Sequence, residues 1–533
     1  MSRIQNDFVW KIAAIALAAS AGLAQAQRFQ EVVGTPLREF AYDVEETRDG
    51  GYATVGWIDG VPGAAGRDIH VVRYDPTGAV LWDRAIDIFG DDVGYSIVAS
   101  RFGGFIVAAE TSAPPLDRQL VLTRLNDLGA VMWTMRYAGT AMGDPIHVPH
   151  PGPALEETEI GDLIVTHTLR QDPTLSRMTA GGGLVYQFAY MPFAPNGIAE
   201  LAFTDLKEDK SSPDIFVSAT LRVSDPAAGI LLEHAPSLLR FSAGGAPIFA
   251  FSYPNVTPKC ADGGRPIESG DGLDQRDTLE IVLAGRTDFG APGQVGIHQI
   301  TLTPGGVPLV STTIDPDVFG ICGPDTPRLE SAYAAVRIDR RTQNSIIAGR
   351  WQPMFGRAAL VMLDPGSALK DIQLYNQGDQ FEAVVPHYSS CGFVATGGIL
   401  ETPIGFGGTD IFNTKTNDAL DSGCLQDRPL VKQEFKDRPI HQYALEWFPV
   451  GAEQVWTPEV YQPGVKNSYF CFDRCCQACP ADWNGDCVLN SSDFLAFLND
   501  WSNGVPSADI AAPFGTFDSS DFLAYLNLYA LGC

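Results

Sequence analysis

Most of the chain repeats one unit, and this repeat constrains the fold more than any other feature. The first copy, between Phe40 and Trp82, has four short runs of alternating apolar and polar residues, separated by glycine-containing turns. Such alternation predicts four antiparallel strands. A second copy begins at Tyr95 and ends at Trp133 with the same order of runs and turns.

Weaker copies follow along the chain. They lie at 176–186, 238–249, 298–310 and 359–369, and a seventh unit starts at Phe381. One copy cannot bury both faces of its sheet, and radial packing of four-stranded sheets is a β-propeller. We therefore predict a mainly β fold, a propeller over residues 27–450. The first two copies resemble repeats common in secreted bacterial propellers. Seven blades fit best, and six or eight remain open because 446–456 also resembles a hairpin.

The repeated residues have a structural interpretation. Gly50, Gly51, Gly103 and Gly104 are expected to supply turns with positive φ. Trp82 and its counterpart Trp133 are expected to pack between neighbouring blades.

The N-terminus has the pattern of a secretory signal peptide. Arg3 and Lys11 precede an apolar run, 12–19, and Ala24-Gln25-Ala26 provides a small-x-small cleavage signal. Residues 1–26 are therefore expected to be removed on export. The apolar run is too short to span a bilayer, so the mature chain is expected to be secreted or held at the cell surface without a membrane span.

The composition narrows the class of partner. The chain carries 36 Lys and Arg against 64 Asp and Glu, a net charge of −28. A nucleic-acid partner is excluded on this basis, because phosphate binding needs clustered basic side chains. The 10 cysteines suit an oxidising compartment.

The C-terminal region contains a second, different repeat. The stretches at 491–499 and 519–527 read SSDFLAFLN and SSDFLAYLN, with apolar residues at helical spacing behind serines that can cap a helix. The preceding residues have the alternate spacing of a twelve-residue calcium loop. The expected ligands of this loop are Asp482, Asn484, Asp486, the main-chain carbonyl of Val488, Asn490 and Asp493.

This region, 479–533, resembles the dockerin modules of secreted bacterial proteins, in the subtype that ends in Gly-Cys. The resemblance implies a small α-helical module that binds one Ca²⁺ at the first loop and docks to a cohesin-like partner. The serines before the last ligands, Ser491, Ser492, Ser519 and Ser520, would contact the partner, or only cap their helices. Cys487 departs from the usual glycine at position six. The second loop retains only Asp509, Asp518 and Asp521, so its binding of calcium is left open.

The cysteines are expected to form disulfides rather than to bind zinc, because the chain is expected to be exported. Six of them lie between Cys471 and Cys533. A Cys479–Cys533 bridge would join the two ends of the module. In the propeller the plausible pairs are Cys260–Cys322 and Cys391–Cys424. Residues 451–478 are interpreted as a cysteine-containing linker.

The sequence contains no catalytic motif such as Gly-x-Ser-x-Gly or His-Glu-x-x-His, and no catalytic residue is assigned. The favoured hypothesis is an exported, scaffold-associated binding protein whose propeller presents a face to a glycan or a protein. The alternative is a polysaccharide-degrading glycosidase or lyase, because the acidic residues of such enzymes leave no local motif. A surface-layer building block is a third hypothesis.

Overall fold

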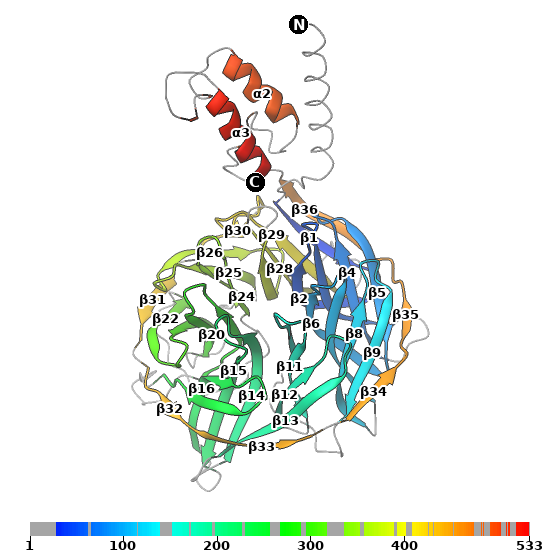
Figure 1. The fold of residues 1–533 in the computed structure, drawn as a ribbon, viewed down its shortest axis with the longest axis vertical. Helices are drawn as coiled ribbons and strands as arrows, with labels where there is room; N and C mark the ends of the chain where they lie inside the picture. The colour runs from blue at the N-terminus through cyan, green and yellow to red at the C-terminus, as the bar shows by residue number, and fades with distance from the viewer. Residues whose placement is uncertain are drawn as a thin grey trace.

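The computed structural model contains seven sheets of five or six strands, arranged in a ring (Figure 1). A mainly β, seven-bladed propeller is therefore confirmed. The structure describes residues 28–61, 66–113, 116–138, 152–169, 172–193, 198–225, 230–255, 267–288, 295–316, 335–351, 357–387, 392–400, 408–424, 426–429, 431–436, 438–450, 452–473, 481, 483, 491–502, 508, 510–511 and 519–531.

Each of blades 1–4 is built from four consecutive antiparallel strands, the first of which lies nearest the central axis. Blade 1 contains β2 (Arg38–Glu46), β3 (Tyr52–Asp59), β4 (Arg67–Tyr74) and β5 (Val80–Asp87). Blade 2 contains β6 (Asp91–Ala99), β7 (Phe105–Ala113), β8 (Leu116–Leu125) and β9 (Val131–Ala138). Blade 3 contains β10 (Ala154–Glu157), β11 (Leu163–Leu169), β12 (Asp172–Met178) and β13 (Leu184–Phe193). Blade 4 contains β14 (Ile198–Glu208), β15 (Ile215–Asp225), β16 (Ile230–Phe241) and β17 (Pro247–Ser252).

Blades 5–7 follow the same plan with two variations. In blade 5 the innermost position is shared by β18 (Ile267–Glu268) and β19 (Gly272–Gln275), followed by β20 (Ile281–Asp288), β21 (Val295–Leu302) and β22 (Pro308–Pro316). Blade 6 contains β23 (Ala335–Ile338), β24 (Ser345–Trp351), β25 (Arg357–Leu363) and β26 (Leu369–Tyr375). Blade 7 contains β27 (Gln380–Pro386), β28 (Phe393–Leu400), β29 (Thr409–Lys415) and the N-terminal strand β1 (Arg28–Gly34), which closes the ring.

Residues 426–473 form a belt that runs around the outside of the ring and adds one strand to every blade (Figure 1). The belt visits blades 6, 5, 4, 3, 2, 1 and 7 in that order. Its strands are β30 (Gln426–Asp427), β31 (Val431–Phe435), β32 (His441–Gln442), β33 (Ala444–Pro449), β34 (Ala452–Trp456), β35 (Glu459–Tyr461) and β36 (Lys466–Asp473). Every belt strand is antiparallel to the outermost blade strand beside it.

The belt differs from the sequence-based expectation for this region. Residues 452–473 fell in the linker at 451–478, yet β34, β35 and β36 pair with blades 2, 1 and 7. The hairpin expected at 446–456 is not an eighth blade, because β33 pairs with blade 3 and β34 with blade 2. The sheets of the propeller therefore extend to Asp473.

The turn that follows the third strand has the same hydrogen bonds in all seven blades. The amide of its first residue donates to the carbonyl of the fifth, and the amide of the fourth donates to the carbonyl of the first. The side chain of the first residue also accepts the amide hydrogen of the fifth. The first residues are Asp75, Asn126, Thr179, Ser242, Thr303, Asp364 and Asn417. These short polar side chains stabilise the turn locally, which explains why the turns recur in the sequence.

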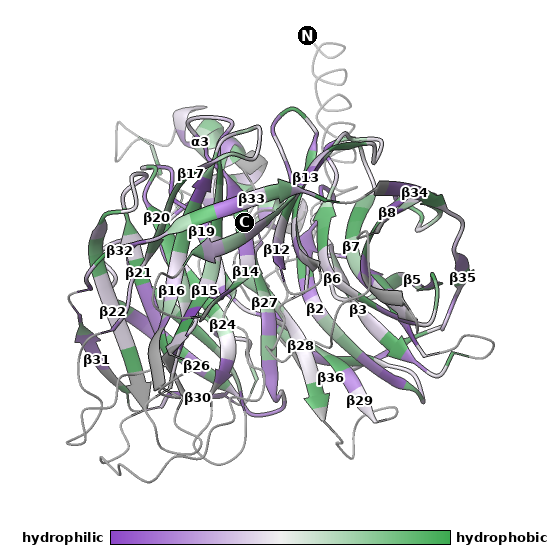
Figure 2. Cartoon of the chain, turned by 90° about the horizontal axis from the view of Figure 1, so that it is seen from below, coloured by the Kyte–Doolittle hydropathy of each residue, from purple (hydrophilic) through white to green (hydrophobic). Residues whose placement is uncertain are grey.

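The hydrophobic core lies between the blades. Seven clusters of buried residues each join two neighbouring blades around the ring. Figure 2 shows the corresponding alternation of hydrophobic and hydrophilic residues along the blade strands. Buried tyrosines add polar ties, because the hydroxyls of Tyr137, Tyr190, Tyr253 and Tyr375 donate to a turn carbonyl of the next blade.

The tryptophan prediction is confirmed, and the glycine prediction is confirmed in part. Trp82 packs in the cluster between blades 1 and 2 and donates from Nε1 to the carbonyl of Asp127, 3.0 Å away. Trp133 packs against the cluster between blades 2 and 3. Positive φ occurs at Gly50, Gly103 and Gly104 but not at Gly51. Gly51 is required for space, because a Cβ there would lie 2.2 Å from the carbonyl oxygen of Tyr74.

The described part of the C-terminal region contains two helices, α2 (Ser491–Ser502) and α3 (Ser519–Leu531). Both helices begin at the first serine of the repeated stretch. Phe497 and Tyr525 are fully buried and stack with ring centroids 4.1 Å apart. Neither helix is long and apolar enough to cross a bilayer.

Candidate functional site

A small cavity lies where the innermost segments of all seven blades converge. It has a volume of about 110 Å³. Its lining comprises Tyr42, Asp43, Tyr95, Ser96, Gly152, Pro153, Ala154, Thr204, Asp205, Asp271, Ala335, Arg337, Glu382 and Ala383. A concave site that gathers polar and aromatic groups from many strands is the default candidate for ligand binding.

Four of the lining residues are β-bulges of the innermost strands. The register of strand pairing shifts at Tyr42 in blade 1, Tyr95 in blade 2, Thr204 in blade 4 and Glu382 in blade 7. A bulge leaves its extra residue outside the ladder and re-aims the side chain, and bulges are frequent beside active sites. The fold thus directs the same position of four blades into one cavity.

Three aspartates on the innermost strands tie each blade to the next. Asp43 accepts the amide hydrogens of Val44 and, from blade 2, Ile97, both at 2.9 Å. Asp205 in blade 4 accepts the amide hydrogen of Leu273 in blade 5 at 3.0 Å. Asp274 in blade 5 accepts the amide hydrogen of Ile338 in blade 6 at 2.7 Å. These contacts give the three carboxylates a structural role at the edge of the cavity.

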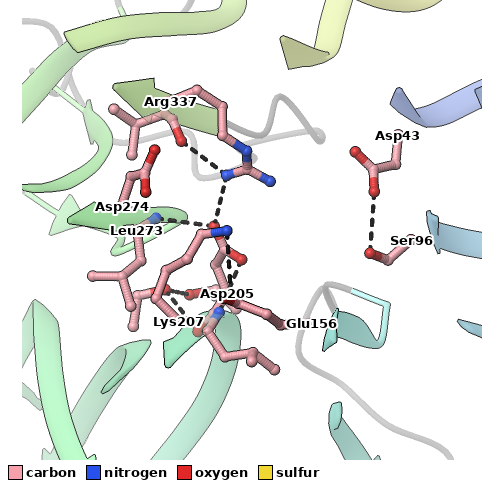
Figure 3. A network of polar contacts seen from close by, with 12 residues as sticks. Asp43, Ser96, Glu156, Asp205, Lys207, Leu273, Asp274 and Arg337 are labelled. Atoms are coloured by element: carbon pink, nitrogen blue, oxygen red, sulfur yellow. Dashed lines mark hydrogen bonds and ion pairs between the residues drawn. The ribbon is translucent and has the colours of Figure 1, made fainter. Parts of the chain in front are cut away.

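Two ion pairs cross the inner ring. Nη1 of Arg337 in blade 6 lies 3.3 Å from Oδ2 of Asp205 in blade 4, and Nζ of Lys207 lies 3.3 Å from Oε2 of Glu156 in blade 3. Figure 3 shows these four side chains gathered on one side, with Asp43 across the opening from them. The side chain of Arg337 remains 25% exposed, which leaves part of its guanidinium accessible to a ligand.

Burial alters the protonation of the carboxyl groups near the cavity. It raises the pKa of Glu45 to about 7, and the charge of Asp43 adds to the effect. It raises the pKa of Glu382 to about 8, against the attraction of Arg286. Burial also raises the pKa of Glu156, which the opposite charge of Lys207 partly offsets. Carboxyl groups with perturbed pKa values in a concave site are candidates for functional groups.

Aromatic rings form one wall of the cavity. The rings of Tyr42 and Tyr95 lie 4.9 Å apart between centroids, and Phe40 lies 4.9 Å behind Tyr42. Tyr95 also covers the backbone of Gly152, because a Cβ at that glycine would lie 1.8 Å from the ring. This wall holds both phenol rings in a fixed position beside the charged groups.

The residues predicted from the sequence lie elsewhere, in the C-terminal helices. Asp493 and Asp521 are fully buried in the first turns of α2 and α3. Oδ1 of Asp521 accepts the amide hydrogens of Ile510 and Ala511, both at 2.9 Å. Ser491 and Ser519 are exposed, and Ser520 is half-buried.

Other predicted positions lie outside the described residues. They are the signal peptide at 1–26, Cys260, Cys322, Cys391, Cys479, Asp482, Asn484, Asp486, Val488, Asn490, Asp509, Asp518, Cys533 and the side chain of Ser492. Cys424 is disulfide-bonded. The linker at 451–478 is described only to Asp473.

The residues of the central cavity were not predicted from the sequence. They are spread over all seven repeats, so they share no local motif. The one signal available was the matching break in alternation at Tyr42-Asp43 and Tyr95-Ser96, where two polar or aromatic residues follow each other in equivalent strands.

No protein-family model and no curated protein sequence matches the chain. Several solved structures are distantly similar. The GH93 α-L-arabinofuranosidase of Fusarium graminearum has a TM-score of 0.40 and 12% identity, over 64% of this chain and 97% of the enzyme. The polysaccharide lyase Uly1 has a TM-score of 0.41 and 9% identity, over 74% of this chain and 100% of the lyase. Drosophila Plexin A, in complex with Semaphorin 1b, has a TM-score of 0.41 and 9% identity, over 74% of this chain and 88% of the plexin chain. At these values the similarities carry no argument about activity.

Proposed function

We propose that this chain is an exported binding protein whose central cavity takes the end of a neutral, hydroxyl-rich ligand such as a short glycan. The observation that carries the proposal is the convergence of fixed aromatic rings and partly exposed charged groups in one cavity. Aromatic faces pack against the C–H faces of a sugar ring, and carboxylates with a guanidinium hydrogen-bond its hydroxyls. A volume of about 110 Å³ suits one end of a ligand, since drug-sized ligands occupy larger pockets.

The charge of the inner ring supports a neutral rather than an anionic ligand. Its carboxyl groups outnumber its cationic partners, which are Arg337, Lys207 and Arg286. Without Glu382 and Glu45, whose pKa values burial raises to about 8 and about 7, its carboxyl groups are still Asp43, Glu156, Asp205, Asp271 and Asp274. An acidic site repels carboxylate and sulfate groups on a polysaccharide.

Binding to neutral and uronic-acid oligosaccharides, measured by calorimetry, tests the proposal. We expect neutral oligosaccharides to bind and Tyr42→Ala to weaken binding at least tenfold, because the substitution removes half of the aromatic wall. Phe102→Ala is the matched control, since Phe102 is 62% exposed and lies outside the cavity lining. Equal affinity of wild type and Tyr42→Ala, or preference for uronic acids, would contradict the proposal.

A specific observation favours the enzymatic alternative, a glycosidase or lyase. Glu382, whose pKa burial raises to about 8, and Asp271, which accepts a hydrogen bond of 2.8 Å from Nε of Arg286, both line the cavity. A pair of carboxyl groups, one of them with a raised pKa, is the usual acid and base of such enzymes. Release of reducing ends or unsaturated products by wild type, lost in Glu382→Gln while ligand binding persists, would establish the alternative.

For the C-terminal region we propose a dockerin-like module that binds Ca²⁺ and docks to a cohesin-like partner, on a protein secreted or held at the cell surface. The support is the helix pair that begins at Ser491 and Ser519, with buried Asp493 and Asp521 in the first turns. Pull-down from the secreted fraction with the full chain tests this proposal. We expect one cohesin-like protein, lost with chelator and in Asp482→Ala. Recovery that is unaffected by either change would contradict it.

A further inference from the structure

Three carboxylates meet at the boundary between blades 1 and 2, away from the central cavity. Asp68 is the second residue of β4, Asp87 is the last of β5 and Asp92 is the second of β6. One oxygen from each lies within 4.8 Å of the other two. Asp68 and Asp92 have no exposed surface, and Asp87 is half-buried. In the described part of the chain, no other group of three His, Cys, Asp or Glu side chains meets this distance.

The two buried carboxylates of this cluster have oxygens without a hydrogen-bond partner in the protein. Both side-chain oxygens of Asp68 are buried and accept no hydrogen bond. Asp92 is held by Oδ2, which accepts the amide hydrogens of Ile88 at 2.6 Å and Phe89 at 3.1 Å, while its buried Oδ1 has no partner. A buried carboxylate without a partner is strongly unfavourable, so such a group indicates a missing ligand or a bound proton.

The electrostatic surroundings are acidic. Burial, together with the charges of Asp87, Asp92 and Asp59, raises the pKa of Asp68 to about 7. Burial likewise raises the pKa of Asp92 to about 6. The neighbouring arginines are committed elsewhere, because Arg67 pairs with Asp91 and Arg38 with Asp59. Every charge that acts on Asp68 therefore comes from another carboxylate.

We propose that Asp68, Asp87 and Asp92 form a calcium site that joins blade 1 to blade 2. Ca²⁺ takes six to eight oxygen ligands at about 2.3–2.6 Å, so oxygens on opposite sides of the ion lie about 4.6–5.2 Å apart. Oxygens within 4.8 Å of one another can all reach one such ion. Mg²⁺ requires near-ideal octahedral geometry at shorter distances, and Zn²⁺ prefers nitrogen and sulfur ligands. Water would supply the remaining ligands.

The cluster lies where an ion would stabilise the contact between the blades and the belt. Asp87 is directly opposite Glu459 of the belt strand β35. The carbonyl of Ile88, beside the cluster, accepts a hydrogen bond of 3.0 Å from Nε1 of Trp456 in β34. An ion held by Asp87 and Asp92 would fix the β5–β6 connection, and with it the contact of this connection with the belt.

Thermal unfolding of the full chain with chelator and with calcium tests the site. With chelator, we expect Asp68→Asn to unfold at the same temperature as wild type or higher, because it removes an unpaired buried acid. With calcium, the melting temperature of wild type should rise by at least about 2 °C, and that of Asp68→Asn should not. The C-terminal region is the same in both proteins, so its own response to calcium cancels in the comparison.

Asp91→Asn is the matched control. Asp91 precedes Asp92 and carries the same charge, but it pairs with Arg67 through two contacts of 2.8 and 2.5 Å. We expect it to retain the calcium response, and titration calorimetry should show one calcium fewer for Asp68→Asn than for Asp91→Asn. If Asp68→Asn does not fold, the half-buried Asp87→Asn replaces it.

Three outcomes would overturn the proposal. The first is an undiminished calcium response in Asp68→Asn. The second is an equal loss of the response in Asp91→Asn, which would indicate general screening of charge. The third is an equal response to Mg²⁺ at the same concentration, which would contradict calcium as the ion. None of these outcomes affects the glycan proposal, which rests on other residues.

Discussion

The inner ring and the belt enclose the same blades but are built in opposite ways. The inner ring takes one segment from each of seven repeated units, and local features such as the bulges at Tyr42 and Tyr95 direct its side chains. The belt is one continuous stretch whose strands range from 2 to 8 residues. The ring gathers polar groups around the central cavity, whereas the belt covers the outer edges of the sheets. Uncovered edges invite pairing with other chains.

The belt depends on a few anchoring side chains. Its strands are short and many of its side chains are exposed, as the pattern of β33 shows. Arg438 is fully buried and contacts both carboxylate oxygens of Glu268 in blade 5. Oδ2 of Asp83 in blade 1 accepts the amide hydrogens of Gly464 at 2.6 Å and Val465 at 3.2 Å. Loss of such anchors should therefore affect the belt more than loss of any exposed residue.

Removal of the belt should have the largest effect. A chain that ends after Cys424 exposes seven outer edges, so we expect it to aggregate. A chain that ends after Asp473 keeps the belt and loses only the C-terminal helices, so it should remain monomeric. Size-exclusion chromatography with light scattering measures the difference. A monomeric, folded product of the shorter chain would show that the belt is not needed to protect the edges.

The buried ion pair should be the strongest single anchor. Arg438→Met leaves Glu268 buried without its partner, and breaking such a pair costs about 3–5 kcal/mol. The double variant Arg438→Met/Glu268→Met should recover most of this loss, because no uncompensated charge remains. Calorimetric unfolding compares the three proteins. A double variant that is less stable than Arg438→Met would contradict the explanation.

Trp456 should contribute less than the ion pair. Its Nε1 donates to Ile88, and the guanidinium of Arg136 lies 4.4 Å from its ring centroid. We expect Trp456→Ala to lower the free energy of unfolding by about 1–3 kcal/mol, because the indole is half-buried. Val455→Ala, in the same strand but 72% exposed, should change it by less than about 0.5 kcal/mol. If both variants lower the free energy of unfolding by a similar amount, Trp456 is not a specific anchor of the belt.

The repeated turns could be predicted from the sequence because their chemistry is local. Asp75 and Gly78 lie within one turn, and the hydrogen bonds that define it involve only neighbouring residues. The belt could not be predicted in this way. Its alternation at 446–456 is that of a hairpin, yet Met191 and Thr134, which pair with its two strands, lie in separate blades.

The candidate site was beyond sequence analysis for the same reason. Arg337 and Asp205 meet across the inner ring although 132 residues separate them. The cluster of Asp68, Asp87 and Asp92 has no recognised ligand spacing. In both cases contact between blades, which no single repeat encodes, completes the group.

The inner ring should show a dependence on pH that the belt lacks. Burial raises the pKa of Glu382 to about 8, so the folded chain retains this proton where the unfolded chain, with a pKa near 4.5, has lost it. Between these values the free energy of unfolding falls as pH rises, by up to about 1.4 kcal/mol per pH unit. Glu382→Gln should flatten this slope, and Glu446→Gln, in the exposed belt strand β33, should leave it unchanged. Denaturant titrations from pH 5 to 8 measure both, and an unaltered slope in Glu382→Gln would show that Glu382 is ionised in the folded protein.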